Sequence, residues 1–212
     1  MLIAIDGPAA SGRGTIAKKV AEHYGLKYLD TGKLYRAFGY LVLNGAENSD
    51  IENESYIAEK AEEISALIDE DLLSKDELNT EEVGSAASIV SAITQVRKAL
   101  LELQKQVANS EQGAVLDGRD IGTVVCPNAN FKFFITAQPE VRAERRYKQL
   151  QNSKKDVTKQ RILQDILARD KRDEGRSVAP LHQAEDAFFI DTSYLRIEDV
   201  LKKVLDIVDS SA

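Results

Sequence analysis

A glycine-rich segment near the start of the sequence has the residue types of a phosphate-binding loop. It runs from Gly7 to Thr15 with the sequence GPAASGRGT, directly after the short run 2–6. In such loops the backbone N–H groups surround a polyphosphate, and the N-terminus of the following helix points at it. The order of strand, loop and helix is the context that the motif requires. The segment therefore predicts a binding site for nucleotide phosphates.

One charged position in this loop departs from the common pattern. Arg13 stands where the pattern G-x-x-x-x-G-K has lysine, and Thr15 follows two residues later rather than one. Lysine is a compact point charge there, whereas a guanidinium is a bulkier planar fork. A glycine-rich turn without a ligand is the alternative interpretation. It leaves the spacing of Gly7, Gly12, Gly14 and Thr15 as a coincidence.

Arginines are the second group with suitable chemistry. A guanidinium binds phosphate oxygens through two parallel hydrogen bonds, and phosphoryl transfer needs positive charge where negative charge spreads over the equatorial oxygens. Arg36 and Arg119 follow predicted strands. Two further sets share helix faces through spacings of three or four residues, namely Arg142, Arg145 and Arg146, and Arg169, Arg172 and Arg176. An exposed, salt-bridged helix surface is the alternative for both sets.

Aspartates at strand ends complete the chemistry. Asp117 and Asp120 belong to the block DGRD, and each is either a turn residue or an acceptor for arginine, magnesium-bound water or a base amino group. Asp6 is placed to orient the glycine-rich loop or the water around magnesium. The Thr15 hydroxyl is the natural protein ligand for Mg²⁺ in this kind of loop.

The elements that must position these residues alternate between strand and helix. We expect strands at 3–6, 27–29, 113–116, 131–136 and 187–190. We expect helices at 15–24, 33–43, 53–68, 81–108, 141–150, 157–173 and 197–208, with a bend near 92–94 and an irregular segment at 69–80. Thr94 is a candidate N-cap. The alternation predicts a parallel sheet covered by helices on both faces.

Ligands of such sheets bind at the carboxyl ends of the strands. The glycine-rich loop, the turn Asp30-Thr31, the DGRD block and the turn 191–193 all follow predicted strands. One site built from distant parts of the chain is therefore expected.

Composition narrows the possible functions. The net charge of −7 argues against a protein that coats nucleic acid. Two histidines make a histidine metal cluster implausible, and Cys126 as the single cysteine fits a reducing cytoplasm. There is no apolar run long enough for a membrane span and no signal segment, so we expect a cytoplasmic protein without membrane or nucleic-acid partners.

Four sequence blocks together resemble the bacterial cytidylate kinases, a family of nucleoside monophosphate kinases. The loop GPAASGRGT is similar to the family pattern G-P-x-x-x-G-K-G-T, which accounts for the displaced threonine. The other blocks are DTGKLYR at 30–36, DGRDIGTVV at 117–125, and RDKRD with RSVAPL within 169–181. Adenylate, guanylate and shikimate kinases do not share the block at 117–125. The resemblance runs from the first predicted strand to the last.

The resemblance implies an α/β fold of the P-loop kinase type, with three layers and a five-stranded parallel sheet. The whole chain 1–212 would form one domain. Its core would comprise about 1–38, 85–140 and 174–212, with a small helical monophosphate-binding insert at about 39–84 and a lid at about 141–173. A monomer is expected.

The implied activity is transfer of the γ-phosphoryl group of ATP to CMP or dCMP, with Mg²⁺. The lid would close over the reactants and exclude water. Two alternatives remain open at this point. The chain could be a P-loop kinase with another acceptor, such as UMP or a small alcohol, or a nucleotide-binding protein weakened by Arg13.

The resemblance also implies roles for individual residues. ATP would be held by Gly7, Pro8, Ala9, Ala10, Ser11, Gly12, Arg13, Gly14, Thr15 and Arg145, with Thr15 on the metal. CMP would be held by Thr31, Tyr35, Arg36, Ser88, Arg97, Asp117, Arg119, Asp120, Arg169, Asp173 and Arg176. The expected catalytic residues are Arg13, Arg119, Arg169 and Arg176.

Besides Arg13, two features depart from the family pattern. Asn79 stands where an arginine is expected, and the insert at 44–84 is short and lacks a clear strand hairpin.

Overall fold

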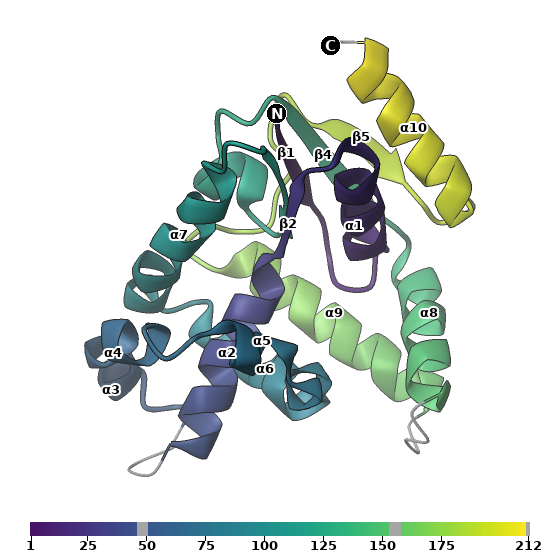
Figure 1. The fold of residues 1–212 in the computed structure, drawn as a ribbon. Coiled ribbons are helices and arrows are strands. Elements are labelled where there is room, and N and C mark those ends of the chain that lie inside the picture. Colours follow the sequence, from purple (N-terminus) through teal and green to yellow (C-terminus); the bar gives the residue numbers. More distant parts are fainter. Residues whose placement is uncertain (46–50, 153–157, 211–212) are drawn as a thin grey trace.

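The fold is built on one five-stranded sheet. The computed structural model describes residues 1–45, 51–152 and 158–210 (Figure 1). The strands are β1 (Leu2–Asp6), β2 (Lys27–Asp30), β3 (Ala114–Gly118), β4 (Phe131–Thr136) and β5 (Phe188–Asp191). Their order is β2-β3-β1-β4-β5, and every neighbouring pair is parallel. The predicted parallel sheet is confirmed, and each strand lies within two residues of its expected bounds.

Helices cover both faces of the sheet, which confirms the three-layer arrangement. The first helix, α1 (Arg13–Tyr24), and the last, α10 (Ile197–Ser210), pack together on one face (Figure 1). Their apolar side chains meet Ile5, Val115 and Phe133 in one buried cluster. On the other face α7 (Thr94–Ala108) covers a second cluster around Leu116. Burial on both faces explains why the inner strands β1 and β3 read as apolar runs.

The remaining helices lie around the carboxyl ends of the strands. They are α2 (Thr31–Asn44), α3 (Glu54–Glu59), α4 (Ala61–Ser65), α5 (Glu70–Ser74), α6 (Glu81–Val90), α8 (Pro139–Asn152) and α9 (Lys159–Gly175). A single 3₁₀ turn, η1 (Asp76–Asn79), precedes α6, and a single π turn, η2 (Ile121–Val125), follows β3.

Three local predictions were wrong. The helix expected at 53–68 is interrupted at Lys60 and ends at Ser65. The segment 69–80 is not irregular, because Asp69 accepts a hydrogen bond from the Leu72 amide and caps α5, and η1 follows. Thr94 is not an N-cap, since it is the first residue of α7 and the cap position belongs to Ile93.

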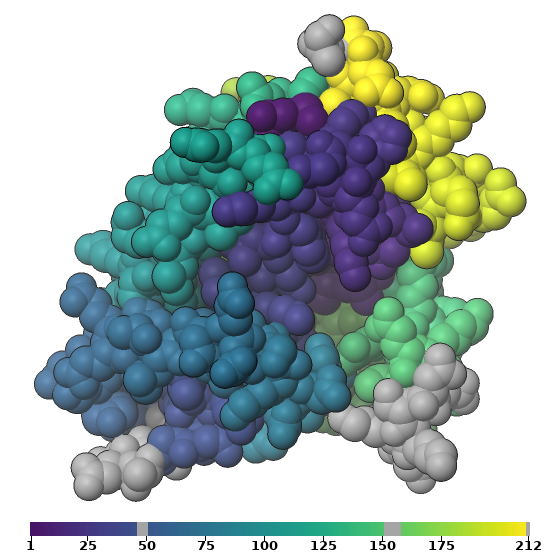
Figure 2. All heavy atoms as spheres, viewed as in Figure 1, coloured from purple at the N-terminus to yellow at the C-terminus, as the bar shows by residue number. Residues whose placement is uncertain are grey.

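The surface is hollowed where the carboxyl ends of the strands meet these helices. Figure 2 shows the hollow between α5 and α6 on one side and α8 on the other. The expected ligand-binding segments border it, as the rule for parallel sheets requires. Within the described residues, no helix is both long and apolar enough to cross a membrane.

Candidate active site

The glycine-rich loop connects β1 to α1 with its backbone open to a ligand. Gly7 has a φ of 154°, and a Cβ atom there would lie 2.0 Å from the Ile135 carbonyl oxygen, so only glycine fits. Gly12 is the N-cap of α1, with a φ of 89° and no side chain that caps the helix. The N–H groups of the first helical turn therefore have no capping acceptor, which is the arrangement that binds phosphate.

Arg13, the unusual residue of this loop, lies folded against it. Its Nη1 donates a hydrogen bond to the Pro8 carbonyl at 3.0 Å, and its buried Nε has no hydrogen-bond partner among the described residues. Burial lowers the pKa of Arg13, and the nearby Arg119 lowers it further, while Asp117 and Asp30 act in the opposite direction. Arg13 therefore carries a charge that the protein itself pairs only partly.

Asp117 lies beneath the loop rather than in the cavity expected to hold an acceptor. Its side chain is 1% exposed, and Tyr28 donates to its Oδ2 at 3.4 Å. A Cβ atom on Gly14 would lie 2.9 Å from the same oxygen. A side chain at position 14 would therefore collide with Asp117, which is a physical reason for glycine directly after Arg13. The hydroxyl-bearing residue of the loop accordingly comes one position later, at Thr15. Burial raises the pKa of Asp117 to about 7, Arg13 opposes the rise and Asp30 adds to it.

The carboxylate of Asp6 binds the backbone of the turn that follows β3. Its two carboxylate oxygens accept hydrogen bonds from the amides of Ile121 and Gly122, each at 2.7 Å. Burial raises its pKa to about 6, and these two hydrogen bonds oppose the rise. Asp6 therefore positions the DGRD turn.

A cavity of about 200 Å³ brings together most of the expected acceptor residues. It is lined, among others, by Thr31, Tyr35, Arg36, Ser88, Arg97, Arg119, Asp120, Arg169, Asp173 and Arg176. Ala9, Ala10 and Arg13 of the loop line the same cavity. Residues from the loop, α2, α6, α7, β3 and α9 thus meet at one place. Asp117 is the one expected acceptor residue outside this lining.

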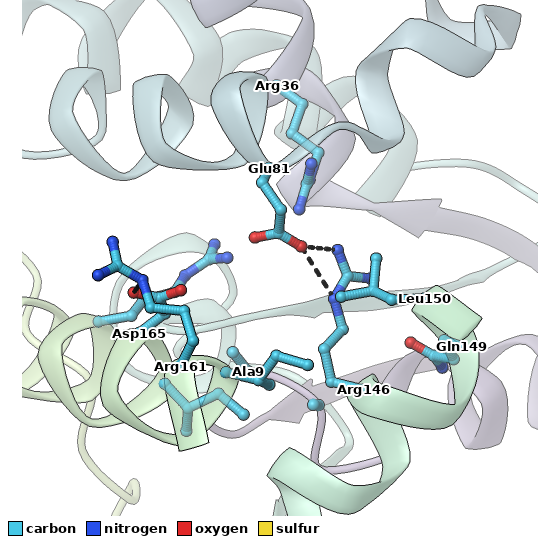
Figure 3. A pocket seen from close by; sticks show the side chains of 12 residues that line it. Ala9, Arg36, Glu81, Arg146, Gln149, Leu150, Arg161 and Asp165 are labelled. Atoms are coloured by element: carbon cyan, nitrogen blue, oxygen red, sulfur yellow. Dashed lines mark hydrogen bonds and ion pairs between the residues drawn. The ribbon is translucent and has the colours of Figure 1, made fainter. Parts of the chain in front are cut away.

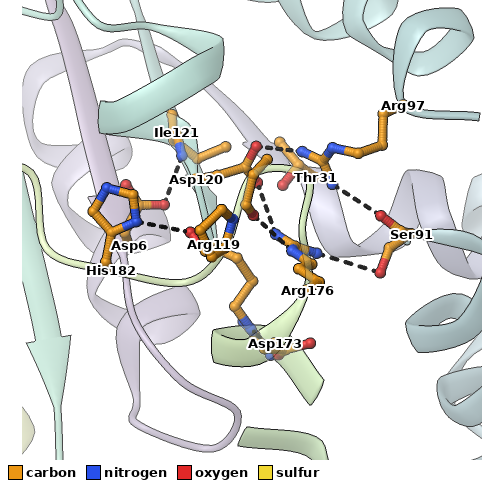
Figure 4. A network of polar contacts seen from close by, with 12 residues as sticks. Asp6, Thr31, Ser91, Arg97, Arg119, Asp120, Ile121, Asp173, Arg176 and His182 are labelled. Carbon is orange, nitrogen blue, oxygen red and sulfur yellow. Dashed lines mark hydrogen bonds and ion pairs between the residues drawn. The ribbon is translucent and has the colours of Figure 1, made fainter. Parts of the chain in front are cut away.

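Asp120 is the centre of a buried network on one side of this cavity (Figure 4). Arg97 donates to Asp120 Oδ2, and Nη2 of Arg176 lies 3.5 Å from Oδ1. Arg97 also donates to the Ser91 carbonyl at 3.2 Å, and Arg176 donates to the Ser91 hydroxyl at 3.4 Å. The carboxylate is therefore held between two guanidinium groups, and it retains acceptor capacity for a ligand.

A second carboxylate, Asp173, orders the neighbouring arginines. Arg119 donates from Nε to Asp173 Oδ2 at 2.7 Å, and Nε of Arg169 lies 3.9 Å from the same oxygen. Burial and the proximity of Arg119 lower the pKa of Arg169 to about 9, against the effect of Asp173. The Ser88 hydroxyl is buried without a hydrogen-bond partner among the described residues. This side of the cavity offers both donors and acceptors to a polar ligand.

Thr31 and Arg36 hold parts of the backbone. The Thr31 hydroxyl donates to the Asp117 carbonyl at 2.8 Å. Arg36 donates to the carbonyls of Leu78 and Thr80 at 2.7 and 3.2 Å. Asn79, between those two carbonyls, is exposed.

Another cavity, of about 410 Å³, lies on the opposite side of the loop, next to α10. Arg145 borders it and donates to the Ser11 carbonyl at 3.2 Å and to the Thr192 carbonyl at 2.7 Å. Thr15 lines the same cavity and is exposed. The expected ATP residues Arg145 and Thr15 thus lie together.

A third cavity, of about 180 Å³, lies where the loop, α2, α6, α8 and α9 approach one another (Figure 3). Ala9, Arg36 and Arg169 line it together with Arg146 and Glu81. In the sequence, Arg146 belongs to a group of three arginines with no individual role, and no motif points to Glu81. Only the chain fold brings these two residues together.

The comparisons with known proteins agree with this geometry. A family model described as "Cytidylate kinase" matches residues 3–210. The chain belongs to the cytidylate kinase family. A cytidylate kinase of Bradyrhizobium sp. (strain ORS 278) is 48% identical over 99% of this chain and 96% of its own length. One of Xanthobacter autotrophicus is 50% identical over 99% of this chain and 98% of its own length.

A solved structure resembles the cytidylate kinase fold of this chain at low sequence identity. An uncharacterized protein from Eubacterium ventriosum aligns with a TM-score of 0.56 and 16% identity, covering 99% of each chain. That likeness concerns the fold alone. The family membership predicted from the four sequence blocks is confirmed by the family model and by the two relatives.

Proposed function

We propose that this chain transfers the γ-phosphoryl group of ATP to CMP or dCMP, giving ADP and CDP or dCDP. The observation that carries the proposal is one cavity with phosphate-loop residues at one end and the buried carboxylate of Asp120 at the other. Arg97 and Arg176 contact this carboxylate without using all of its acceptor sites, since an aspartate can accept several hydrogen bonds. A carboxylate accepts from the exocyclic amine of cytosine, which uracil lacks.

On the acceptor side, Asp120, Arg97 and Ser88 would contact the cytosine. The CMP phosphate would be bound by Thr31, Arg36 and Arg119. Arg169, Asp173 and Arg176 would contact the ribose and phosphates, because they come from one end of α9 and line the same cavity. Asp117 acts from beneath the loop in this proposal, since it lies outside the cavity lining.

On the donor side, the loop 7–15 would hold the ATP phosphates, with Arg145 beside it. Catalysis would rest on positioning and on positive charge placed where negative charge develops, so no general base needs to be named. Arg13, Arg119, Arg169 and Arg176 would supply this charge. Arg13 would leave the Pro8 carbonyl to do so.

The donor set also fits Mg²⁺. This ion keeps several waters and is bound by one or two protein oxygens together with substrate phosphates. Thr15 offers an exposed hydroxyl oxygen on the loop, and no cluster of three acidic, histidine or cysteine ligands occurs in the part of the chain that the structure describes. Bound there, Mg²⁺ would supply charge neutralisation for the phosphates.

The arrangement of the chain supports a division into three parts. The insert at about 39–84 would close on the acceptor, and the lid at about 141–173, which contains α8 and α9, would exclude water that competes with CMP. We further propose that the enzyme acts as a monomer in the cytoplasm.

A coupled ADP-release assay with ATP, Mg²⁺ and a panel of CMP, dCMP and UMP tests this function. CMP and dCMP should turn over well above UMP. The same panel with Arg13→Lys separates the effect of the loop arginine from the choice of acceptor. No turnover by the natural chain, with turnover restored in Arg13→Lys, would contradict the proposal. Equal use of UMP would contradict the role of Asp120.

Calorimetry distinguishes an enzyme from a binding protein weakened by Arg13. A binding protein takes up ATP and CMP without forming CDP. The proposed kinase binds both and forms CDP when they are mixed with Mg²⁺.

A further inference from the structure

An ion pair connects α8 with the first turn of α6 across the mouth of the third cavity. Nε of Arg146 donates to Oε1 of Glu81 at 3.1 Å, and Nη2 donates to the same oxygen (Figure 3). The two residues are 65 positions apart in the sequence. The side chains of Glu81 and Arg146 are 55% and 27% exposed, so water still reaches the pair.

Glu81 lies among positive groups. Burial lowers the pKa of Arg36, Arg146 lowers it further, and Asp30 and Glu81 act in the opposite direction. Beyond the ion pair, Glu81 and Glu82 line a cavity of about 340 Å³ together with Arg161, Arg169 and Arg172 of α9. Asp165 lines it too and pairs with Arg161 at 3.3 Å, so Arg169 and Arg172 supply most of the positive charge there. The acidic start of α6 therefore faces arginines from both helices of the expected lid.

Guanidinium groups at the third cavity are the kind of donor that binds phosphate. Arg146 and Arg36 line it together with Ala9 of the phosphate loop, so the cavity presents two guanidinium groups beside that loop. A carboxylate and a phosphate oxygen use the same guanidinium donors. Glu81 therefore competes with a bound phosphate for Arg146.

We propose that Glu81 is a positioning residue that stands in for a phosphate between Arg146 and Arg36, holding α8 against α6 until nucleotide displaces it. The inference rests on the proposed phosphoryl transfer, because it concerns the same arginines. An ion pair that water reaches contributes little to the stability of the contact between α8 and α6, because solvent screens its charges. The ion pair of Glu81 therefore holds α8 against α6 only weakly, and a charged phosphate can displace the Glu81 carboxylate from Arg146.

Two effects of opposite sign follow from this role. Without the Glu81 carboxylate, α8 loses its tie to α6 in the nucleotide-free protein, so the lid opens more often. Without the same carboxylate, phosphate no longer has a competitor for Arg146, so phosphate binds more tightly. A residue that only supports the fold would loosen the lid and weaken binding together.

The variant Glu81→Gln tests both effects without relying on turnover. Hydrogen exchange of the described parts of α8 and α9 in the nucleotide-free protein should become faster. Calorimetry with inorganic pyrophosphate should give a dissociation constant about two- to fivefold lower than that of the natural chain. Pyrophosphate is chosen because its binding does not depend on the base of the acceptor.

Two further variants serve as matched controls. Glu82→Gln removes the same charge from the same helical turn but leaves the pair intact, so exchange and pyrophosphate affinity should both stay unchanged. Arg146→Lys keeps the charge and loses the two-donor contact. It should speed exchange in the lid without the gain in pyrophosphate affinity.

The proposal is overturned if Glu81→Gln weakens pyrophosphate binding, if exchange and affinity both stay unchanged, or if Glu82→Gln reproduces the effect. A parallel titration with CMP tests the proposed acceptor. If CMP does not bind to the natural chain, the proposed function fails, whereas the exchange and pyrophosphate results still decide the role of Glu81.

Discussion

The two ends of the cavity of about 200 Å³, which contains Asp120 and Arg13, present arginine in different ways. At the end proposed to hold cytidine, Arg97 and Arg176 contact the buried carboxylate of Asp120. At the phosphate end, Arg13 donates to a backbone carbonyl rather than to a carboxylate. Arg36 likewise donates to the carbonyls of Leu78 and Thr80.

The arginines paired with carboxylates are fixed in place before a ligand binds, whereas those bonded to carbonyls have a positive charge that no carboxylate contacts directly. A buried guanidinium that contacts a carboxylate is held in one position, and removing either partner leaves an unpaired buried charge. A guanidinium that contacts only carbonyls is not neutralised by them, so its positive charge can still pair with an anionic ligand. Removing it from water costs free energy that a bound anion would offset. The arginines at the cytidine end are therefore held in place by the protein itself, whereas those at the phosphate end would be paired by the negative charge of the substrate phosphates.

The largest expected effect comes from removing charge at the phosphate end. Arg13→Ala should lower kcat for CMP phosphorylation by about 10²- to 10³-fold, the usual cost of losing one charge-stabilising contact in the transition state. The thermal midpoint should not fall, because Arg13 is half-buried and its one side-chain hydrogen bond within the described residues goes to the Pro8 carbonyl. Steady-state ADP release and a thermal unfolding scan measure the two quantities.

Arg13→Lys is the control for this variant, because lysine keeps the charge at the same position. Its kcat should stay within about tenfold of that of the natural chain. A clear drop in the thermal midpoint of Arg13→Ala would show that the loop arginine supports the fold, and the contrast between the two ends would not hold.

The second prediction concerns the ion pair between Arg97 and Asp120 at the cytidine end. Arg97→Ala should destabilise the protein by about 3 kcal/mol, because Asp120 would stay buried with Arg176 as its remaining cationic partner. Urea unfolding would measure the loss as a lower transition midpoint with an unchanged slope. Glu63→Gln removes one partner of the exposed pair with Lys60 and should leave the transition midpoint nearly unchanged, because solvent screens that pair. Equal effects of the two variants would refute the prediction.

The third prediction concerns selectivity at the same carboxylate. Asp120→Asn keeps the size of the side chain but adds an amide donor, which can serve the uracil carbonyl. The ratio of kcat/KM for CMP over UMP should fall by about 10- to 100-fold, the range of one polar contact to a base. An unchanged ratio would remove Asp120 from base recognition and leave it as a support for Arg97.

Local sequence signals were sufficient for the frame of the molecule. β1, β3 and β4 are largely apolar runs, and strand and helix patterns alternate along the chain, so the parallel sheet could be predicted. The segment 69–80 could not, because a five-residue helix and one 3₁₀ turn are too short to establish a periodic pattern. Their formation depends on burying Leu72 and Leu78 against α2 and α6.

The site residues that belong to sequence motifs could be predicted, but the surroundings of each side chain could not. Asp117 lies within β3, where it packs beneath the loop, whereas Asp120 follows the strand and lines the cavity. The sequence block DGRD does not show this difference. Tyr28 and Glu81 carry no local signal, since their partners lie 89 and 65 residues away. Long-range packing alone reveals their contacts.

The smallest predicted effect concerns Asp117, which links the two ends from beneath the loop. Burial raises its pKa from 3.8 to about 7, so between these pH values the folded state binds more protons than the unfolded state. The contribution of Asp117 to stability therefore falls as the pH rises through that window. Asp117→Asn cannot titrate, so its thermal midpoint should gain on that of the natural chain by about 2–4 °C between pH 5 and pH 8 for each 1 kcal/mol involved. A difference between the two proteins that stays constant with pH would mean that Arg13 and Arg119 keep Asp117 ionised throughout, and that the charge beneath the loop is already paired before any phosphate binds.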